Sequence, residues 1–200
     1  MTRTVRRLSL AVTVSLALVL PASAQNDRPP AGERGTELDA LIGAGSTTTH
    51  TGPLLAGIAG WRMTSWARAE ARGAWLMRGT GADAFAADLG AAFNIAFVQR
   101  MSPYVGAGVG LYRASFDSPA AEMSDFYRRR LGETRVTGQS RSFTDPGVRL
   151  SAGVDWRLTD RIFLRPEASA LFVRRDGRGE TMGMFGVRLG YRFEDRPVTP

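Results

Sequence analysis

Apolar and polar residues alternate with a period of two in the stretch 181–193, TMGMFGVRLGYRF. One face of this stretch is apolar and ends in Tyr191 and Phe193, whereas the other carries Arg188 and Arg192 among small or flexible residues. Successive side chains of a β-strand point to opposite faces of the sheet, so the pattern predicts a strand with one apolar face and one charged face.

The same period recurs in seven further segments. We predict strands over 36–46, 54–63, 66–77, 85–97, 103–113, 148–158 and 161–173. Leu41 breaks the alternation of the first segment, and Pro53 is expected to open the second, where its missing N–H is harmless. Pro166 lies within the seventh segment, so we expect a bulge or a lost ladder contact beside it.

The connections between these segments differ in length in a regular way. Those after the even strands are brief, whereas those after the odd strands vary widely and include a polar segment, Phe116–Asp145, of about 30 residues. Short turns at one end and longer loops at the other are typical of outer-membrane barrels. The pattern therefore predicts an all-β fold, an eight-stranded antiparallel up-and-down transmembrane barrel with both termini at the short-turn end.

The amino terminus has the pattern of an export signal. A basic start is followed by an apolar run from Leu8 to Leu20, about 13 residues long and too short for a membrane-spanning helix, and then by the small residues of a cleavage site. We divide the chain into a cleaved signal peptide (1–24), a flexible leader (25–34), a barrel domain (35–194) and a carboxy-terminal tail (195–200).

Composition narrows the possible chemistry. The formal net charge is +7 and falls to +4 without the three signal arginines, and all 26 basic residues are arginine. Cysteine is absent, which excludes disulfides and thiolate metal sites. After the signal no stretch approaches 18 apolar residues, so insertion into a membrane would have to use β-strands.

Charge falls almost entirely on one face of the predicted strands, as eight arginines and six carboxylates. We expect them to form an ion-pair network inside a narrow lumen: Glu37, Asp39, Arg62, Arg68, Glu70, Arg72, Asp88, Arg149, Asp155, Arg157, Arg165, Glu167, Arg188 and Arg192. The opposite face is nearly free of charge and carries aromatic residues near the short-turn end. We expect these to form a girdle at a membrane interface: Trp61, Phe97, Trp156, Tyr191 and Phe193.

An alternative is a soluble periplasmic carrier, a cup with the opposite orientation of its two faces. Such a cup would place the charged face outward around a wide apolar cavity, and it would have no use for an aromatic girdle. The membrane barrel is therefore the favoured interpretation.

Three stretches, Pro103–Arg113, Val154–Phe172 and Gly186–Phe193, resemble the small outer-membrane β-barrel family, which includes opacity proteins and the barrel part of outer membrane protein A. The resemblance implies residence in the outer membrane of a Gram-negative bacterium. It also implies that periplasmic chaperones and the barrel-assembly machinery act during biogenesis. The assembly machinery would recognise Tyr191 and Phe193 in the last strand. Seven residues follow Phe193 here, whereas the family often ends at the aromatic residue.

Few residues suggest catalysis. Some small outer-membrane enzymes modify the acyl chains of lipid A with a histidine and a serine near the outer rim, which makes the single histidine, His50, with Ser46 the candidate pair. As a solvated loop residue His50 needs no catalytic role, and we favour that interpretation. The run from Gly106 to Gly110 lacks the spacing of a nucleotide-binding loop and is explained by small inward residues of a strand.

Arg128, Arg129 and Arg130 form a basic run in the long polar segment. In an exported chain their anionic partner would be the phosphates of lipopolysaccharide rather than nucleic acid, unless the run is simply solvated.

The function predicted from sequence is structural or surface-interactive, in a monomer with a closed or very narrow lumen. We expect no enzyme activity, no cofactor, no metal and no nucleic-acid partner. The alternatives are a lipid A-modifying acylase or acyltransferase and a narrow passive channel.

Overall fold

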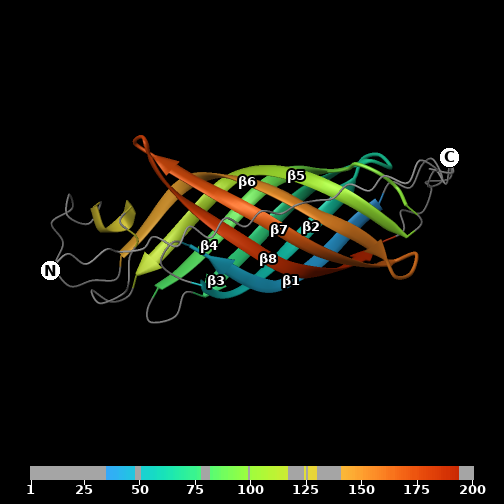
Figure 1. Ribbon diagram of the computed structural model, residues 1–200, viewed down its shortest axis with the longest axis horizontal. Helices are drawn as coiled ribbons and strands as arrows, with labels where there is room; N and C mark the ends of the chain where they lie inside the picture. The colour runs from blue at the N-terminus through green and yellow to red at the C-terminus, as the bar shows by residue number, and fades with distance from the viewer. Residues whose placement is uncertain are drawn as a thin grey trace, which may run out of the picture.

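The computed structural model describes residues 35–47, 51–77, 82–98, 100–116, 124, 126–129 and 141–193. Eight strands follow one another along the chain: β1 (Gly35–Ser46), β2 (Thr51–Arg62), β3 (Ala67–Met77), β4 (Ala82–Asn94), β5 (Met101–Phe116), β6 (Arg141–Arg157), β7 (Ile162–Arg175) and β8 (Arg178–Arg192). Each pairs antiparallel with its neighbours in sequence, and β1 pairs with β8 to close the barrel (Figure 1). The predicted fold class is confirmed.

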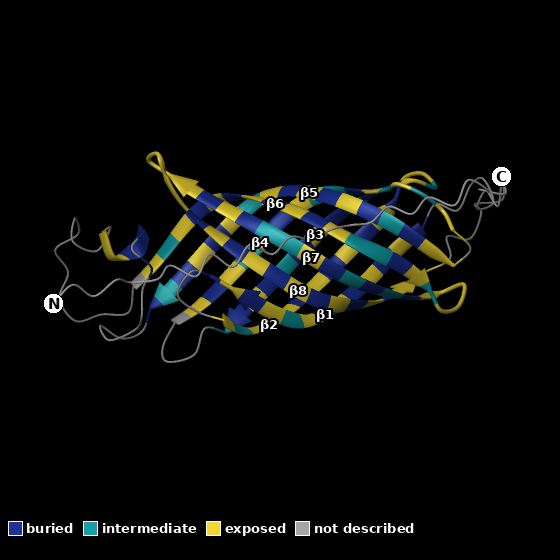
Figure 2. Cartoon of the chain, viewed as in Figure 1, coloured by how far each residue is buried: buried dark blue, intermediate teal, exposed yellow. Residues whose placement is uncertain are grey.

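The pairing register defines the geometry of the barrel. Following paired residues once around, from Ser46 through β8, β7, β6, β5, β4, β3 and β2, returns to β1 at Thr36, ten residues away. Eight strands with this stagger are inclined to the barrel axis by about 40°. Along most strands buried and exposed residues alternate, which gives the chequered surface in Figure 2.

The strands continue further from the girdle end than their polarity predicted. β5 reaches Phe116 and β6 begins at Arg141, so the predicted loop Phe116–Asp145 shrinks to a connection that includes a short helix at 126–129. β7 and β8 meet in a two-residue turn, Asp176-Gly177. Beyond the apolar band the outward residues are polar while inward residues such as Phe116 and Val173 are apolar, so the expected pattern ends although backbone pairing continues.

Other strand ends also require correction. β4 ends at Asn94, so Phe97 lies in the connection that follows and not in the strand. Pro53 is the third residue of β2 and pairs with Ala44, instead of opening the strand. Leu41 does not break the alternation of β1, because its inward side chain is buried among apolar neighbours.

Pro166 interrupts the ladder between β6 and β7. Gly153 pairs with Glu167 and Trp156 pairs with Leu164, but the two pairs between them are missing. The register is the same on both sides of the gap. The expected loss of ladder contacts is therefore confirmed, and the alternative, a bulge, is not present there.

The barrel interior has two layers. The half nearer the girdle is filled by the charged residues, whereas the other half is an apolar cluster that includes Leu54, Leu76, Leu171, Met182 and Met184. The part of the chain that the structure describes contains no helix long and apolar enough to cross a membrane. The predicted signal peptide, leader and tail lie outside the described residues.

Candidate functional site

Charged side chains from seven of the eight strands meet inside the barrel. Thirteen of the fourteen predicted network residues are buried; they are Glu37, Asp39, Arg62, Arg68, Glu70, Arg72, Asp88, Arg149, Asp155, Arg165, Glu167, Arg188 and Arg192. Each occupies an inward position of its strand, because strands expose every second residue to the lumen.

Arg165 joins three strands at the centre of this network and is completely buried. Its Nη1 donates to Asp39 Oδ2 at 2.7 Å, and its Nη2 donates to Glu37 Oε2 at 2.6 Å and to Asp155 Oδ2 at 3.1 Å. One side chain of β7 therefore crosslinks β1 and β6 through the lumen.

Arg188 does the same from β8 and is 1% exposed. It donates through Nε and Nη2 to Asp39, through Nη2 to Glu70 Oε1 at 2.9 Å and through Nη1 to Glu167 Oε2 at 2.8 Å. Asp39 is thus shared by the two central arginines, and β1, β3, β7 and β8 are tied together.

Shorter links extend the network around the wall. Arg149 bonds Asp88 at 2.9 Å, and Arg72 donates to the free oxygen of Glu167 at 2.6 Å. Arg68 donates to Glu70 Oε1 at 2.7 Å. These contacts leave each arginine with a carboxylate partner, which a buried cation requires.

Arg62 and Arg192 close the network at its girdle end. Both bond Glu37 Oε1, at 3.3 and 3.0 Å, and the Arg192 guanidinium also stacks 4.1 Å from the ring centre of Phe163. Arg157 is the exception among the fourteen. It is half-buried at this mouth and forms no ion pair with a residue that the structure describes.

Two uncharged aromatic residues belong to the site although the sequence reasoning missed them. Tyr104 donates its hydroxyl to Glu167 Oε2 at 2.9 Å and packs under the Arg68 guanidinium at 4.5 Å. Phe163 lies against Arg165 as well as Arg192. The sequence does indicate that both side chains point into the barrel, because each residue alternates with apolar residues of the outward face.

The far end of the lumen is closed by aromatic packing. Tyr127, from the short helix between β5 and β6, is fully buried, with its ring centre 5.3 Å from Phe116 and 5.4 Å from Phe143. Phe126 contacts Tyr127 edge to face at 4.8 Å. The connection after β5 thus contributes an apolar plug, which the sequence reasoning treated only as a polar loop.

Gly108 allows the network to pack tightly. A Cβ at this position would lie 2.7 Å from Asp88 Oδ1 and 3.4 Å from a guanidinium nitrogen of Arg149. The glycines of 106–110 make room for luminal side chains, consistent with the interpretation as small inward residues and not as a nucleotide loop.

The outer surface of the barrel is apolar between two bands of exposed aromatic residues. The five predicted girdle residues are all exposed at one end of the barrel, with Tyr191 and Phe193 in edge-to-face contact at 5.0 Å. A second set of exposed aromatics near the other end was missed: Trp75, Phe85 and Phe172. Sequence signals existed for all three, because each lies on the apolar face of its strand.

Beyond the second aromatic set, the apolar part of the outward face ends at a polar residue in seven strands. We call these residues the outer polar ring: Ser46, Thr51, Asp83, Arg113, Thr144, Arg174 and Thr181. In β8 ten residues separate Tyr191 from Thr181, which is about 25 Å along the barrel axis at the observed stagger. That length matches the apolar band of an outer-membrane barrel.

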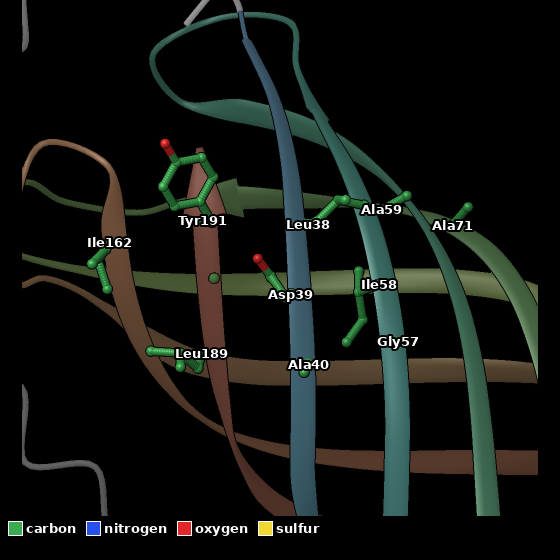
Figure 3. A pocket seen from close by; sticks show the side chains of 11 residues that line it. Leu38, Asp39, Ala40, Gly57, Ile58, Ala59, Ala71, Ile162, Leu189 and Tyr191 are labelled. Atoms are coloured by element: carbon green, nitrogen blue, oxygen red, sulfur yellow. The ribbon is translucent and has the colours of Figure 1, made fainter. Parts of the chain in front are cut away.

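A shallow apolar groove of about 670 Å³ crosses the outside of β8, β1 and β2. It forms because Ala40, Gly57 and Ala59 are small, whereas Leu189 and Tyr191 stand at one side of it (Figure 3). The groove lies within the apolar band and holds no cluster of polar side chains for binding a soluble ligand. No group of three or more metal-ligating side chains occurs among the described residues either.

The candidate catalytic pair is only partly visible. Ser46 lies at the end of β1 and shares a hydrogen bond of 2.9 Å with the hydroxyl of Thr51, whereas His50 lies outside the described residues. In the basic run, Arg128 and Arg129 are exposed on the short helix, and Arg130 lies outside the described residues.

Comparisons with known proteins agree with this geometry. Neisserial surface protein A has 16% sequence identity and a TM-score of 0.60, with 82% of this chain and 99% of that chain covered. The amino-terminal β-barrel domain of Pseudomonas aeruginosa OprF has 16% identity and a TM-score of 0.55, with the same coverage. At these identities the likeness establishes the fold alone.

No curated protein matches the sequence at a significant level. The family described as "Outer membrane protein beta-barrel domain" matches residues 10–193, nearly the whole chain. The chain therefore belongs to the outer membrane protein β-barrel domain family.

Proposed function

We propose that this protein is a closed scaffold barrel of the bacterial outer membrane, which stabilises the envelope and presents its outer rim to the surroundings without conducting solutes or catalysing a reaction. The observation that carries the proposal is Arg165, which is fully buried and bonds carboxylates of β1 and β6 across the lumen. An eight-stranded barrel encloses only enough space for side chains, and here that space is filled by ion pairs and by the aromatic plug.

Conductance across a planar bilayer tests this proposal. The folded protein should give no discrete current steps, even at high protein density. The gel shift of the folded form, measured on the same protein in lipid vesicles, serves as the check that the protein is inserted. Stepwise currents from the unaltered protein would contradict the closed barrel and favour the narrow-channel alternative.

We further propose that Arg128 and Arg129 contact phosphates of lipopolysaccharide. Both are exposed on the short helix of the longest connection, and arginine pairs well with phosphate oxygens. Replacing both with serine should slow lipopolysaccharide-assisted folding, measured as the appearance of the faster-migrating form on a detergent gel. An unchanged rate would count against this contact.

We also propose that segment 1–24 is removed on export, as its basic, apolar and small-residue order supports. The mass of the protein extracted from outer membranes should then correspond to a chain beginning at Gln25.

A further inference from the structure

The outward faces of the strands carry charge at only three positions among the described residues. They are Asp83 on β4, Arg113 on β5 and Arg174 on β7, and all three belong to the outer polar ring. Charges on the lipid side cost roughly 2–4 kcal/mol at the bilayer midplane and little near the interfaces. Their restriction to one rim therefore marks the level of the headgroups.

The two arginines lie at the same level and close together on this surface. Arg113 pairs with Thr144 of β6, and the pairing of Val173 with Gly147 places Arg174 beside Pro146 on the other edge of β6. The Cα atoms of Arg113 and Arg174 are two strand spacings apart across the sheet and two residues apart along the strands. The distance between them is therefore about 12 Å. Both guanidinium groups can therefore reach one large headgroup.

The surroundings of Arg113 suit an anion with hydroxyl groups. Its Nη2 donates to Ser142 Oγ at 3.0 Å, which holds the guanidinium over the face of β6. Below the two arginines, Leu111 and Phe172 are exposed and begin the apolar band. Asp83 lies on the far side of Arg113, so the surface between β5 and β7 is positive.

We propose that Arg113 and Arg174 form a binding site for the phosphates of lipid A in the outer leaflet. Lipid A is a phosphorylated disaccharide with several acyl chains. Its phosphates would therefore meet the guanidinium groups, its sugar hydroxyls would meet Ser142 and Thr144 on β6, and its chains would lie on the apolar surface below. Arginine binds phosphate through two parallel N–H groups, which favours it over other residues at such a site.

The inference rests on the proposed function in one respect: the end of the barrel opposite the girdle must lie in the outer leaflet. It is distinct from the loop contact of Arg128 and Arg129, which lie on the helix between β5 and β6 and not on the strand faces. It is also independent of the conductance result, because the two arginines do not face the lumen.

The test is thermal unfolding of the full-length folded protein in detergent, titrated with lipid A and followed by the gel shift between folded and unfolded forms. The probes are lipid A, dephosphorylated lipid A and phosphatidylglycerol. Lipid A should raise the midpoint temperature more than either other lipid, and the increment should shrink as salt increases.

The variant R113Q/R174Q should bind lipid A roughly tenfold more weakly for each arginine removed. The matched control R100Q/R161Q removes two exposed arginines at the girdle end and should keep the full increment.

Three results would overturn the proposal. They are an undiminished increment in R113Q/R174Q, an equal increment with dephosphorylated lipid A, and an equal increment with phosphatidylglycerol. An undiminished increment in R113Q/R174Q would show that the two arginines do not bind lipid A. An equal increment with dephosphorylated lipid A would show that the acyl chains account for binding. An equal increment with phosphatidylglycerol would show that any anionic lipid binds. If R113Q/R174Q folds poorly, the single variants R113Q and R174Q should each lose about half of the increment.

Discussion

Arg165 and Arg188 are buried cations whose cost is offset by direct contacts with carboxylates. Each makes charge-assisted hydrogen bonds to three acidic side chains at 2.6–3.1 Å. Removing one partner from such a group leaves uncompensated charge in a dry interior, which is more damaging than replacing the whole group by apolar residues.

Replacing Arg165 by alanine should lower the free energy of unfolding by about 3–5 kcal/mol, because Glu37, Asp39 and Asp155 would lose a shared partner. Urea titration of the folded fraction, read from the gel shift, measures this change. R100A, at an exposed turn, serves as the control and should change the value by less than about 0.5 kcal/mol. Equal midpoints for the two variants would remove the structural role assigned to Arg165.

For single residues, the sequence predicts the face of the strand that each side chain occupies but not the residue that it contacts. Parity alone places Arg188 inward, whereas its bond to Asp39 joins positions 149 residues apart. That contact depends on the stagger of the closed barrel, which no local pattern contains. Arg157 lies on the same inward face of β6 as Arg149 and Asp155, but at the mouth of the barrel. Alternation indicates the face of a residue and not its position along the barrel axis.

The hairpin between β7 and β8 shows how an element is fixed by its turn. Asp176 and Gly177 have φ values of 51° and 75°, the left-handed conformations that a two-residue type I′ turn requires. Asp-Gly is a strong sequence signal for such a turn. The reasoning from polarity placed a loop there because the outward residues above Phe172 are no longer apolar.

Gly177→Ala should reduce the free energy of unfolding by about 1–2 kcal/mol, because a Cβ is unfavourable in the left-handed region although the space around Gly177 is open. Gly57→Ala is the matched control. It also has open space for a Cβ but lies within a strand, so it should be neutral or stabilising. Equal urea midpoints for both variants would show that the turn conformation does not limit stability.

Over the whole molecule, the chain reverses the usual distribution of polarity. Ion pairs fill one half of the interior and an apolar cluster fills the other, whereas the outside between the girdle and the outer polar ring has no charge on any described strand. Alternation along the strands was enough to predict the closed barrel and which face of each strand points into it. The apolar half of the lumen was not predicted. Both faces of the strands are apolar there, so hydrophobicity does not alternate along the sequence.

The most direct measurement uses the four tryptophans of the chain, Trp61, Trp66, Trp75 and Trp156, all of which are exposed on the outer surface. The protein folded into bilayers whose acyl chains carry bromine should lose most of its tryptophan emission, whereas iodide in the aqueous phase should quench it weakly. Strong quenching by iodide with little effect of the brominated chains would place these rings in water and contradict a barrel with its apolar face toward lipid.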